Sequence, residues 1–289
     1  MYVCPVTRSP LRDGRSSATG LQYPNVDGIP ILVSDPRGYL ARVHARTPAD
    51  ADITRTGAPD PITPHLPAHM LGAPGGFGQW LGTLGDGGPD AYAAAYAGKF
   101  APPGPACDVG CGLGVMARRM VAMGRDTWAF DDNLDAVLLA RGVLCGVLPG
   151  VSIPTHRNGA RQVKVPFRPI GEGLHLAVAD ATLPPFTTGA FAWVHLGDVL
   201  DDAGDAMGDV LVASAELVGK AGLLTVCTAY GARTHEEGER ADPQEELLEA
   251  LDGLGFDIVE QADRIPQVTR VYDRSFRVRF AHCIAARRR

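Results

Sequence analysis

The sequence predicts an α/β protein: a doubly wound parallel sheet with an antiparallel last strand, preceded by a small β-containing module. Three observations predict this fold. Strand-like apolar runs alternate with helical patterns from residue 106 onward, and a glycine-rich turn follows the first run. The last two strand-like runs are joined by a loop too short for a crossover helix, so they should pair antiparallel. With 289 residues, the chain can bury one full α/β core and a small appendage.

Residues 1–34 form the expected amino-terminal module. They contain two short strand-like runs, "MYVCPV" and "IPILV", and Asp27-Gly28 is a good turn between two strands. Residues 35–88 are rich in proline and glycine and show little periodicity, so we expect a linker or a lid over the site. The stretch "PDAYAAAYAGKF" then predicts a helix with Pro89 as its first residue.

The catalytic-type domain is expected over 89–289, with strands and helices in regular alternation. An inserted hairpin is expected at about 151–167, because strand-like runs flank Asn158-Gly159. Asp242 should cap the last helix, with Pro243 as its first residue and Gly255 as its stop signal. The expected strands end near 107, 130, 180, 198 and 230, followed by the antiparallel pair 257–266 and 275–288.

Composition limits the classes of partner. Hydrophobic residues make up 45% of the chain and charged residues 21%, as in ordinary globular proteins. The net charge of −6 argues against a nucleic-acid partner, because proteins that track phosphates usually carry a basic excess. The sequence shows neither a membrane span nor the apolar core of a signal peptide, so we expect no membrane partner and a cytoplasmic location. The six scattered cysteines, without a C-x-x-C pair, predict buried free thiols.

The glycine-rich turn is the first candidate site. Gly110, Gly112 and Gly114 stand at every second position between a strand-like run and a helical pattern. Glycine lets the backbone approach a ligand closely and adopt positive φ angles, although such a triplet also fits a tight turn that binds nothing. Val115 occupies the place of the last glycine in the dehydrogenase fingerprint, and the lysine of a Walker A loop is missing. Neither a dinucleotide site nor a P-loop is therefore predicted.

Three acids accompany the glycines. Asp108 begins the loop, Asp131 ends the second strand of the sheet and Asp180 ends the third. Because the carboxyl ends of parallel strands meet at one edge, the three acids outline a single adenosine site. Asp131 can accept hydrogen bonds from ribose hydroxyls, and Asp180 can accept one from the adenine amino group.

These motifs carry a resemblance to a known family. The stretches "DVGCGLG", "AFDDN" and "VADATLPPF" resemble the S-adenosylmethionine-binding motifs of class I methyltransferases, which have a Rossmann-like sheet with an antiparallel last strand. The resemblance implies S-adenosylmethionine as the cofactor. It places Asp108 and the glycines around the methionine part, Asp131 on the ribose, and Asp180 with its neighbour near the adenine. The cofactor residues expected are Asp108, Gly110, Cys111, Gly112, Gly114, Asp131, Asp132, Asp180, Ala181 and, from the preceding helix, Tyr96.

The amino-terminal module carries a second resemblance. The stretch "CPVTRSPL", followed by "LQYPNVDGIPILVSDPRG", resembles the small Trm112-like domain. Zinc-binding members of that family use four cysteines, of which only Cys4 is present here, so we expect no metal. In that family the domain often supports a methyltransferase. Here it could be structural, or it could help to hold a substrate or a second subunit.

Methyl transfer needs an aligned nucleophile and, for some acceptors, a base. The catalytic candidates are Asp198 at the end of the fourth strand and Tyr230 at the end of the fifth. Each also fits a structural role, as a helix cap for Asp198 and as a pocket wall for Tyr230. His195 is an alternative base or a packed core residue, and His235 is a base candidate or an exposed loop residue. Tyr96 could cover the methionine end of the cofactor or simply pack with Tyr92 in its helix.

The sequence shows no signature of the nucleic-acid methyltransferases and no paired metal-binding acids. With the acidic charge, this favours an S-adenosylmethionine-dependent methyltransferase acting on a small-molecule acceptor, either a metabolite or a natural product. The alternatives are a protein, peptide or RNA acceptor, and a cofactor-binding regulatory subunit without turnover. An exposed strand edge and the amino-terminal module are each candidates for a homodimer contact.

Overall fold

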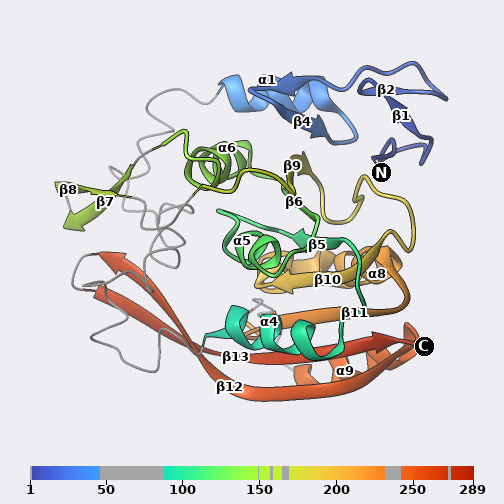
Figure 1. Cartoon of the computed structure of the whole chain (residues 1–289), viewed down its shortest axis with the longest axis vertical. Coiled ribbons are helices and arrows are strands. Elements are labelled where there is room, and N and C mark those ends of the chain that lie inside the picture. The colour runs from blue at the N-terminus through green and yellow to red at the C-terminus, as the bar shows by residue number, and fades with distance from the viewer. Residues whose placement is uncertain are drawn as a thin grey trace.

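The computed structural model describes residues 2–45, 88–148, 150–156, 159–164, 169–231, 242–272 and 275–289. Most of the expected linker or lid, from residue 46 to residue 87, lies outside these ranges, and so does His235. Within the described residues, nine strands form one mixed sheet in the order β12-β13-β11-β10-β5-β6-β9-β4-β3 (Figure 1). The strands from β11 to β4 run parallel, whereas β13, β12 and β3 are antiparallel to their neighbours. The predicted α/β fold with an antiparallel last strand is confirmed.

The sheet is built from short central strands and a long outer pair. Its strands are β3 (Asn25–Val26), β4 (Ile29–Leu32), β5 (Ala106–Val109), β6 (Thr127–Asp131), β9 (Leu174–Ala179), β10 (Phe191–Gly197), β11 (Val218–Thr228), β12 (Phe256–Tyr272) and β13 (Ser275–Arg288). Two small antiparallel pairs lie outside it, β1 (Leu11–Arg12) with β2 (Arg15–Ser16) and β7 (Gly150–His156) with β8 (Gly159–Lys164). The second pair is the predicted inserted hairpin.

Helices cover both faces of the sheet, as expected for a doubly wound fold. They are α1 (Pro36–Ala45), α4 (Pro89–Phe100), α5 (Val115–Ala122), α6 (Leu134–Leu144), α7 (Val199–Asp202), α8 (Met207–Leu217) and α9 (Pro243–Gly253), with a 3₁₀ turn η2 at Gly204–Ala206. Helices α4 and α5 pack on one face, over Trp193 and Leu223, and α8 and α9 pack on the other, over Leu224 and Ile284. Figure 1 shows the two pairs of helices on opposite sides of the strands. No helix of the described ranges combines the length and the apolar character that crossing a membrane requires.

Local sequence signals determine where these helices begin. Pro89 opens α4, as predicted. The side chain of Asn133 caps α6 by accepting hydrogen bonds from the backbone N–H groups of Asp135 and Ala136. Asp242 caps α9 in the same way through Gln244, and Gly255 adopts a φ of 85° just beyond the end of that helix.

The amino-terminal segment takes part in the main sheet. Asp27 and Gly28, with φ angles of 48° and 83°, form the predicted turn between β3 and β4. Strand β4 then pairs in parallel with β9, so the segment extends the sheet beyond the strands expected from residue 106 onward. The strand-like run at "MYVCPV" forms isolated bridges, Tyr2 to Phe186 and Val3 to Pro10, instead of a continuous strand. The boundary of a separate module at residue 34 stays a prediction.

Helix α1 was not predicted. It occupies the beginning of the segment expected to be loop-rich. Asp35 stabilises its first turn by accepting a hydrogen bond from the backbone N–H of Gly38 at 2.9 Å. Tyr39, Leu40 and Val43 pack against the same core cluster as Ile31 of β4. Tertiary packing on β4 therefore supports a helix that local periodicity did not indicate.

The outer pair β12–β13 positions residues from the end of the chain near the centre of the sheet. Strand β13 pairs with β11 from Leu223 to Thr228, and β12 pairs with β13 along almost its whole length. Both strands continue past the carboxyl ends of β10 and β11, as Figure 1 shows. Their far halves bring Gln267 and Arg279 to Asp198.

Candidate functional site

The glycine loop lies at the carboxyl edge of the sheet and is held by an acid from the next strand. Asp131 at the end of β6 accepts a hydrogen bond from the backbone N–H of Gly112 at 2.8 Å through Oδ2. Its other oxygen, Oδ1, accepts one from the N–H of Asn133 at 2.9 Å. The carboxylate expected to hold a ribose thus also fixes the loop relative to the start of α6.

The three glycines face different surroundings. All three have positive φ angles, 67° at Gly110, 50° at Gly112 and 73° at Gly114. A Cβ atom at Gly110 would lie 2.7 Å from Cγ2 of Val199, and one at Gly114 would lie 2.6 Å from Cδ1 of Leu144. A Cβ atom at Gly112 would meet nothing within 4 Å. Gly110 and Gly114 are therefore required for packing, whereas Gly112 borders open space.

Asp108 anchors the helix that follows the loop. Its carboxyl is 3% exposed and accepts a hydrogen bond from the backbone N–H of Ala117 at 2.9 Å. Burial, and after it the charge of Asp90, raises the pKa of Asp108 well above the usual range. Asp108 is thus a buried support of the loop. Its predicted contact with the cofactor stays a prediction.

Two other predicted cofactor residues are packed in the interior. Cys111 is 8% exposed, and its backbone N–H donates to the carbonyl of Phe130 at 2.9 Å. Tyr96 is 5% exposed and meets Tyr92 edge to face, with ring centroids 6.2 Å apart. The helix-packing interpretation of Tyr96 is favoured by this burial. All six cysteines are free thiols, and all but Cys145 are buried.

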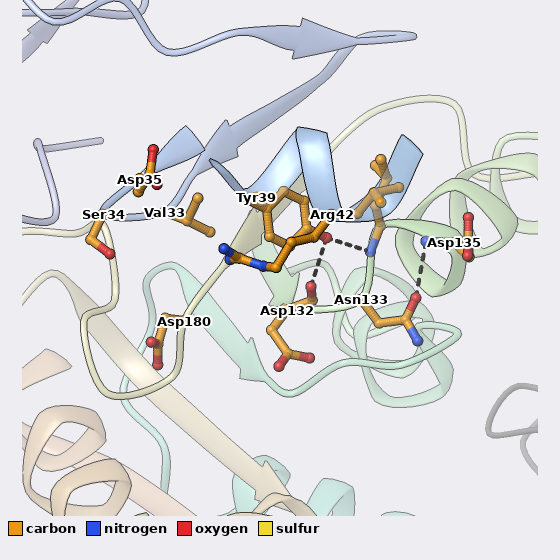
Figure 2. Close-up of a pocket in the computed structure, with 11 residues that line it drawn as sticks. Val33, Ser34, Asp35, Tyr39, Arg42, Asp132, Asn133, Asp135 and Asp180 are labelled. Carbon is orange, nitrogen blue, oxygen red and sulfur yellow. Dashed lines mark hydrogen bonds between the residues drawn. The ribbon is translucent and has the colours of Figure 1, made fainter. Parts of the chain in front are cut away.

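A cavity of about 450 Å³ lies beside Asp131 at the same edge (Figure 2). Its lining comes from the turn after β4, from α1, from the turn between β6 and α6, and from the end of β9. The lining residues are Val33, Ser34, Asp35, Tyr39, Arg42, Val43, Asp132, Asn133, Leu134, Asp135 and Asp180. We call it the acidic cavity, because four of these residues are aspartates and only one is a cation.

Asp132 and Asp180, both among the predicted cofactor residues, face the acidic cavity. Asp180 accepts two hydrogen bonds from Thr182 through Oδ1, from the backbone N–H at 2.8 Å and from Oγ1 at 2.7 Å. Partial burial, and after it the neighbouring Asp131, raises the pKa of Asp132. Ala181 follows Asp180 and is half-buried. The structure thus brings Asp132 and Asp180 together around one opening, whereas Asp131, the residue predicted to hold the ribose, is not among its lining residues.

A second polar group lies further along the edge, where β10 ends. Asp198 adopts a φ of 59°, and its carboxylate accepts a hydrogen bond from Nε2 of Gln267 and lies 3.6 Å from Nη2 of Arg279. Three atoms of this group are buried without a hydrogen-bond partner, namely Oδ1 of Asp198, Oε1 of Gln267 and Nε of Arg279. We call these three residues the hairpin cluster, after the antiparallel pair β12–β13 that carries Gln267 and Arg279. The side chain of Asp198 does not cap α7, although that helix begins directly after it.

Burial dominates the electrostatics of the hairpin cluster. It raises the pKa of Asp198 to about 6, against the opposing effects of Arg279 and Gln267. The raised pKa suits a group that exchanges a proton near neutral pH. The strained backbone at this position is a common feature of functional residues.

Tyr230 lies at the end of β11 and also has a positive φ, 53°. Its hydroxyl is 2.7 Å from Nδ1 of His282, whose Nε2 is 3.0 Å from Oε1 of Gln261. Because Gln261 Oε1 can only accept, Nε2 of His282 donates to it, and Nδ1 accepts from Tyr230. Asp201 holds the turn beneath Tyr230 by accepting from Thr228 Oγ1 and from the N–H groups at 229 and 231.

His195 is buried under α4. It is 1% exposed, its Nδ1 lies 3.0 Å from Oγ1 of Thr225, and burial lowers its pKa to about 3. Its Cα is paired in register with that of Asp108 on β5, so both side chains lie on the same face of the sheet. This environment keeps the imidazole neutral and favours the packed interpretation over the interpretation as a base.

The structure also reveals residues that the sequence analysis did not single out. Tyr39 and Arg42 come from α1, and Gln267 and Arg279 come from the β12–β13 pair. No local motif marks any of them, because each reaches its position through strand pairing between distant segments. In the described ranges, no group of three or more His, Cys, Asp or Glu side chains is arranged to hold a metal ion.

Comparisons with known proteins show where this fold recurs. No family model and no curated protein matches the chain. A solved structure described as "Conversion of a Disulfide Bond into a Thioacetal Group during Echinomycin Biosynthesis" superposes with a TM-score of 0.50 at 15% identity, covering 71% of this chain and 83% of that chain. This similarity supports a shared fold.

Two further solved structures are named as methyltransferases. One is a SAM-dependent methyltransferase from Methanosarcina mazei, with a TM-score of 0.46, 16% identity, and coverage of 66% of this chain and 95% of that chain. The other is the magnesium protoporphyrin IX methyltransferase of Synechocystis PCC 6803 with bound SAM, with a TM-score of 0.44, 18% identity, and coverage of 69% and 77%.

Proposed function

We propose that the protein is an S-adenosylmethionine-dependent methyltransferase that acts on a small-molecule acceptor. The observation that carries the proposal is the convergence of Gly112, Asp131 and Asp180 at one edge of the sheet, beside a cavity of about 450 Å³. Cavities of this size suit small organic ligands. The order of glycine loop, first acid and second acid along successive strands is the order that the family resemblance requires.

The residues present fit this cofactor. Gly112 leaves open space where a ligand can approach the backbone. In our proposal, Asp131 and Asp132 bind the ribose hydroxyls, and Asp180 and Ala181 contact the adenine. Thr182 occupies Oδ1 of Asp180, which leaves Oδ2 as an acceptor for the amino group of the base. The remaining loop residues, Gly110, Cys111 and Gly114, would surround the methionine part with Asp108 beneath them.

The hairpin cluster is the proposed acceptor site. When bound, S-adenosylmethionine would supply an electrophilic methyl group, and its sulfonium sulfur would leave as a neutral thioether with the electrons of the broken sulfur–carbon bond. Asp198 would act as the base, its carboxylate taking the proton from the hydroxyl or amine of the acceptor. Gln267 and Arg279 hold the carboxylate in place from one side. Oδ1 of Asp198 is buried and has no hydrogen-bond partner, so an acceptor hydroxyl or amine that reaches it would supply the missing partner.

Tyr230 and His195 have positioning roles in this proposal. The Tyr230 hydroxyl is engaged with His282, so in this proposal the tyrosine ring serves as a wall of the acceptor site and not as a base. His195 lies beneath the loop and stays neutral, which makes it a support of the site. The Asp198 side chain is 20% exposed, and this burial favours a small acceptor over a folded macromolecule.

The resemblance of residues 4–38 to the Trm112-like domain also remains a proposal. It is supported by the antiparallel pair β3–β4 with the Asp27-Gly28 turn. Cys4 is buried and shares a hydrogen bond of 3.1 Å with the hydroxyl of Tyr23, an environment suited to a thiol that is part of the core.

The test uses methyl-labelled S-adenosylmethionine and an extract separated into small-molecule, protein and RNA fractions. We expect label to enter the small-molecule fraction with the wild type and with Asp205→Asn, a matched exposed aspartate. We expect at least a 100-fold slower transfer with Asp198→Asn. Label in protein or RNA would refute the acceptor class. Tight cofactor binding without transfer to any fraction would show a regulatory subunit instead of an enzyme.

A further inference from the structure

We propose that α1 is part of the cofactor site and that the acidic cavity binds an uncharged nucleoside. In this proposal Tyr39 positions the turn at 132–134, and Arg42 contacts the base from above. The inference rests on the proposed function and extends it to the amino-terminal segment. It assigns a ligand-binding role to a helix that was not predicted from the sequence.

The register of β4 against β9 places the end of β4 beside Asp180. Strand β4 pairs in parallel with β9, Ile31 opposite Val178 and Leu32 opposite Ala179. Neighbouring strands lie about 4.8 Å apart, so the residues that follow both strands leave the sheet side by side. Asp180 and the turn at 33–35 therefore form opposite walls of one opening, and α1 starts directly above it.

Tyr39 connects α1 to the turn between β6 and α6. Its hydroxyl donates to the backbone carbonyl of Asp132 at 2.8 Å and accepts from the N–H of Leu134 at 3.0 Å. Asn133 satisfies the next two N–H groups of α6, and Tyr39 satisfies the one before them. A residue 93 positions earlier in the chain thus fixes the turn that carries Asp132.

Arg42 of α1 also lines the acidic cavity. Figure 2 shows its guanidinium extending from α1 into the acidic cavity, on the side of Asp132 and Asp180. A planar guanidinium stacks well on the face of an aromatic base. A base held between Arg42 and the turn at 132–134 would present its edge to Asp180, the residue to which the family resemblance assigns the adenine.

The residues that line the acidic cavity carry an excess of negative charge. Asp35, Asp132, Asp135 and Asp180 line the acidic cavity with Arg42 as the only cation among the lining residues. Partial burial, and after it the nearby Asp131 and Asp180, raises the pKa of Asp132. A phosphate would be repelled by these carboxylates, whereas ribose hydroxyls and a base amino group donate hydrogen bonds to carboxylates. The cavity therefore selects a nucleoside over a nucleotide.

The test is calorimetric titration of the wild type and three variants with S-adenosylhomocysteine, adenosine and adenosine 5′-monophosphate. The variants are Tyr39→Phe, Arg42→Ala and, as a matched control, Arg37→Ala, an exposed arginine of α1 that does not line the cavity. We expect Tyr39→Phe and Arg42→Ala each to weaken S-adenosylhomocysteine about threefold to tenfold, and adenosine by the same factor. Arg37→Ala should match the wild type, and the monophosphate should bind at least tenfold more weakly than adenosine.

Several outcomes would overturn the inference. These are equal binding of adenosine and its monophosphate, wild-type affinity in Arg42→Ala, or a loss with S-adenosylhomocysteine that adenosine does not share. If Tyr39→Phe lowers the melting temperature, Arg42→Ala still decides, because its side chain is exposed. The proposed function fails separately: it is refuted if the wild type binds no S-adenosylhomocysteine, while adenosine and its monophosphate still test the cavity.

Discussion

The acidic cavity and the hairpin cluster lie at the same edge of the sheet but are built in opposite ways. Around the cavity, polar groups have partners: both oxygens of Asp131 accept backbone hydrogen bonds, and the hydroxyl of Tyr39 both donates and accepts. In the hairpin cluster, one atom each of Asp198, Gln267 and Arg279 is buried without a partner. Buried polar groups in folded proteins are almost always paired.

Backbone conformation also differs between the two regions. Asp198 and Tyr230, at the ends of β10 and β11, both adopt left-handed conformations that cost energy for residues with side chains. In the glycine loop of the same edge, the comparable conformations fall on Gly110, Gly112 and Gly114, where they cost little. One end of the edge is thus hydrogen-bonded and free of such strain, whereas the other combines unpartnered buried atoms with left-handed backbone at residues that carry side chains. Four predictions test this contrast.

The largest effect is expected at Asp198. Asp198→Asn should lower the rate of transfer by about 10²- to 10⁴-fold, because the amide cannot take up a proton. Affinity for S-adenosylhomocysteine should stay within twofold, because the hairpin cluster does not line the acidic cavity. Calorimetry and single-turnover rates, with Asp205→Asn as the control, measure both quantities. A large loss of cofactor affinity would show that the two regions are one site.

Substitutions in the glycine loop should separate packing from binding. Gly110→Ala combines a positive φ with a contact of 2.7 Å to Val199, so the free energy of unfolding should fall by about 2–4 kcal/mol. Gly112→Ala has open space around its new methyl group and should cost only about 1–2 kcal/mol for its backbone conformation. Urea denaturation measures this difference. Equal losses would contradict the distinction between the two glycines.

The raised pKa of Asp198 predicts two pH dependences. Transfer should fall about tenfold per pH unit below about 6, where the carboxyl is protonated. For stability the sign is opposite to that of a salt-bridged acid: the folded state holds its proton more tightly, so stability is lost as pH rises from 3.8 to about 6. Asp198→Asn should remove that loss, which amounts to at most about 3 kcal/mol. Melting temperatures at pH 4 and pH 7 test it, and a difference between the two that Asp198→Asn leaves unchanged would contradict the assignment.

The smallest effect is expected at Tyr230. Tyr230→Phe removes the hydrogen bond to His282 and leaves Nδ1 of that histidine without a donor. The free energy of unfolding should fall by about 1 kcal/mol, with the rate of transfer changed less than threefold. Thermal melts and rates give the comparison. A tenfold slower rate with normal stability would show instead that the hydroxyl contacts the acceptor.

The sequence predicted the parts of this edge that depend on neighbouring residues. The glycine loop, Asp131 and Asp180 each follow a strand directly, so a local pattern of strand, turn and acid was enough to locate them. The antiparallel end of the sheet followed from a loop too short for a helix. Tyr39 and Arg42 could not be found in this way, because their helix has little periodicity of its own and depends on packing against β4.

The hairpin cluster likewise depends on residues that lie far apart in the sequence, so only part of it could be predicted. Asp198 was identified by its place after β10, but its partners Gln267 and Arg279 follow it by about seventy residues or more. Gln267 and Arg279 reach Asp198 because β12 and β13 extend beyond the other strands of the sheet. The residues around Gln267 and Arg279 do not predict how far these two strands extend. His195 had two sequence interpretations, and only its burial beneath α4 separates them.

The pairing of β4 with β9 also bears on folding and aggregation. Strand β9 has buried residues along its carboxyl half, and without β4 its backbone would form an open edge ready to pair with another chain. The partner that closes it comes from far earlier in the sequence, so the contact carries a high loop-closure cost and should form late. Until it forms, α1 cannot complete the acidic cavity. A ligand of that cavity would therefore act as a folding aid, drawing partly folded chains away from association toward the closed sheet.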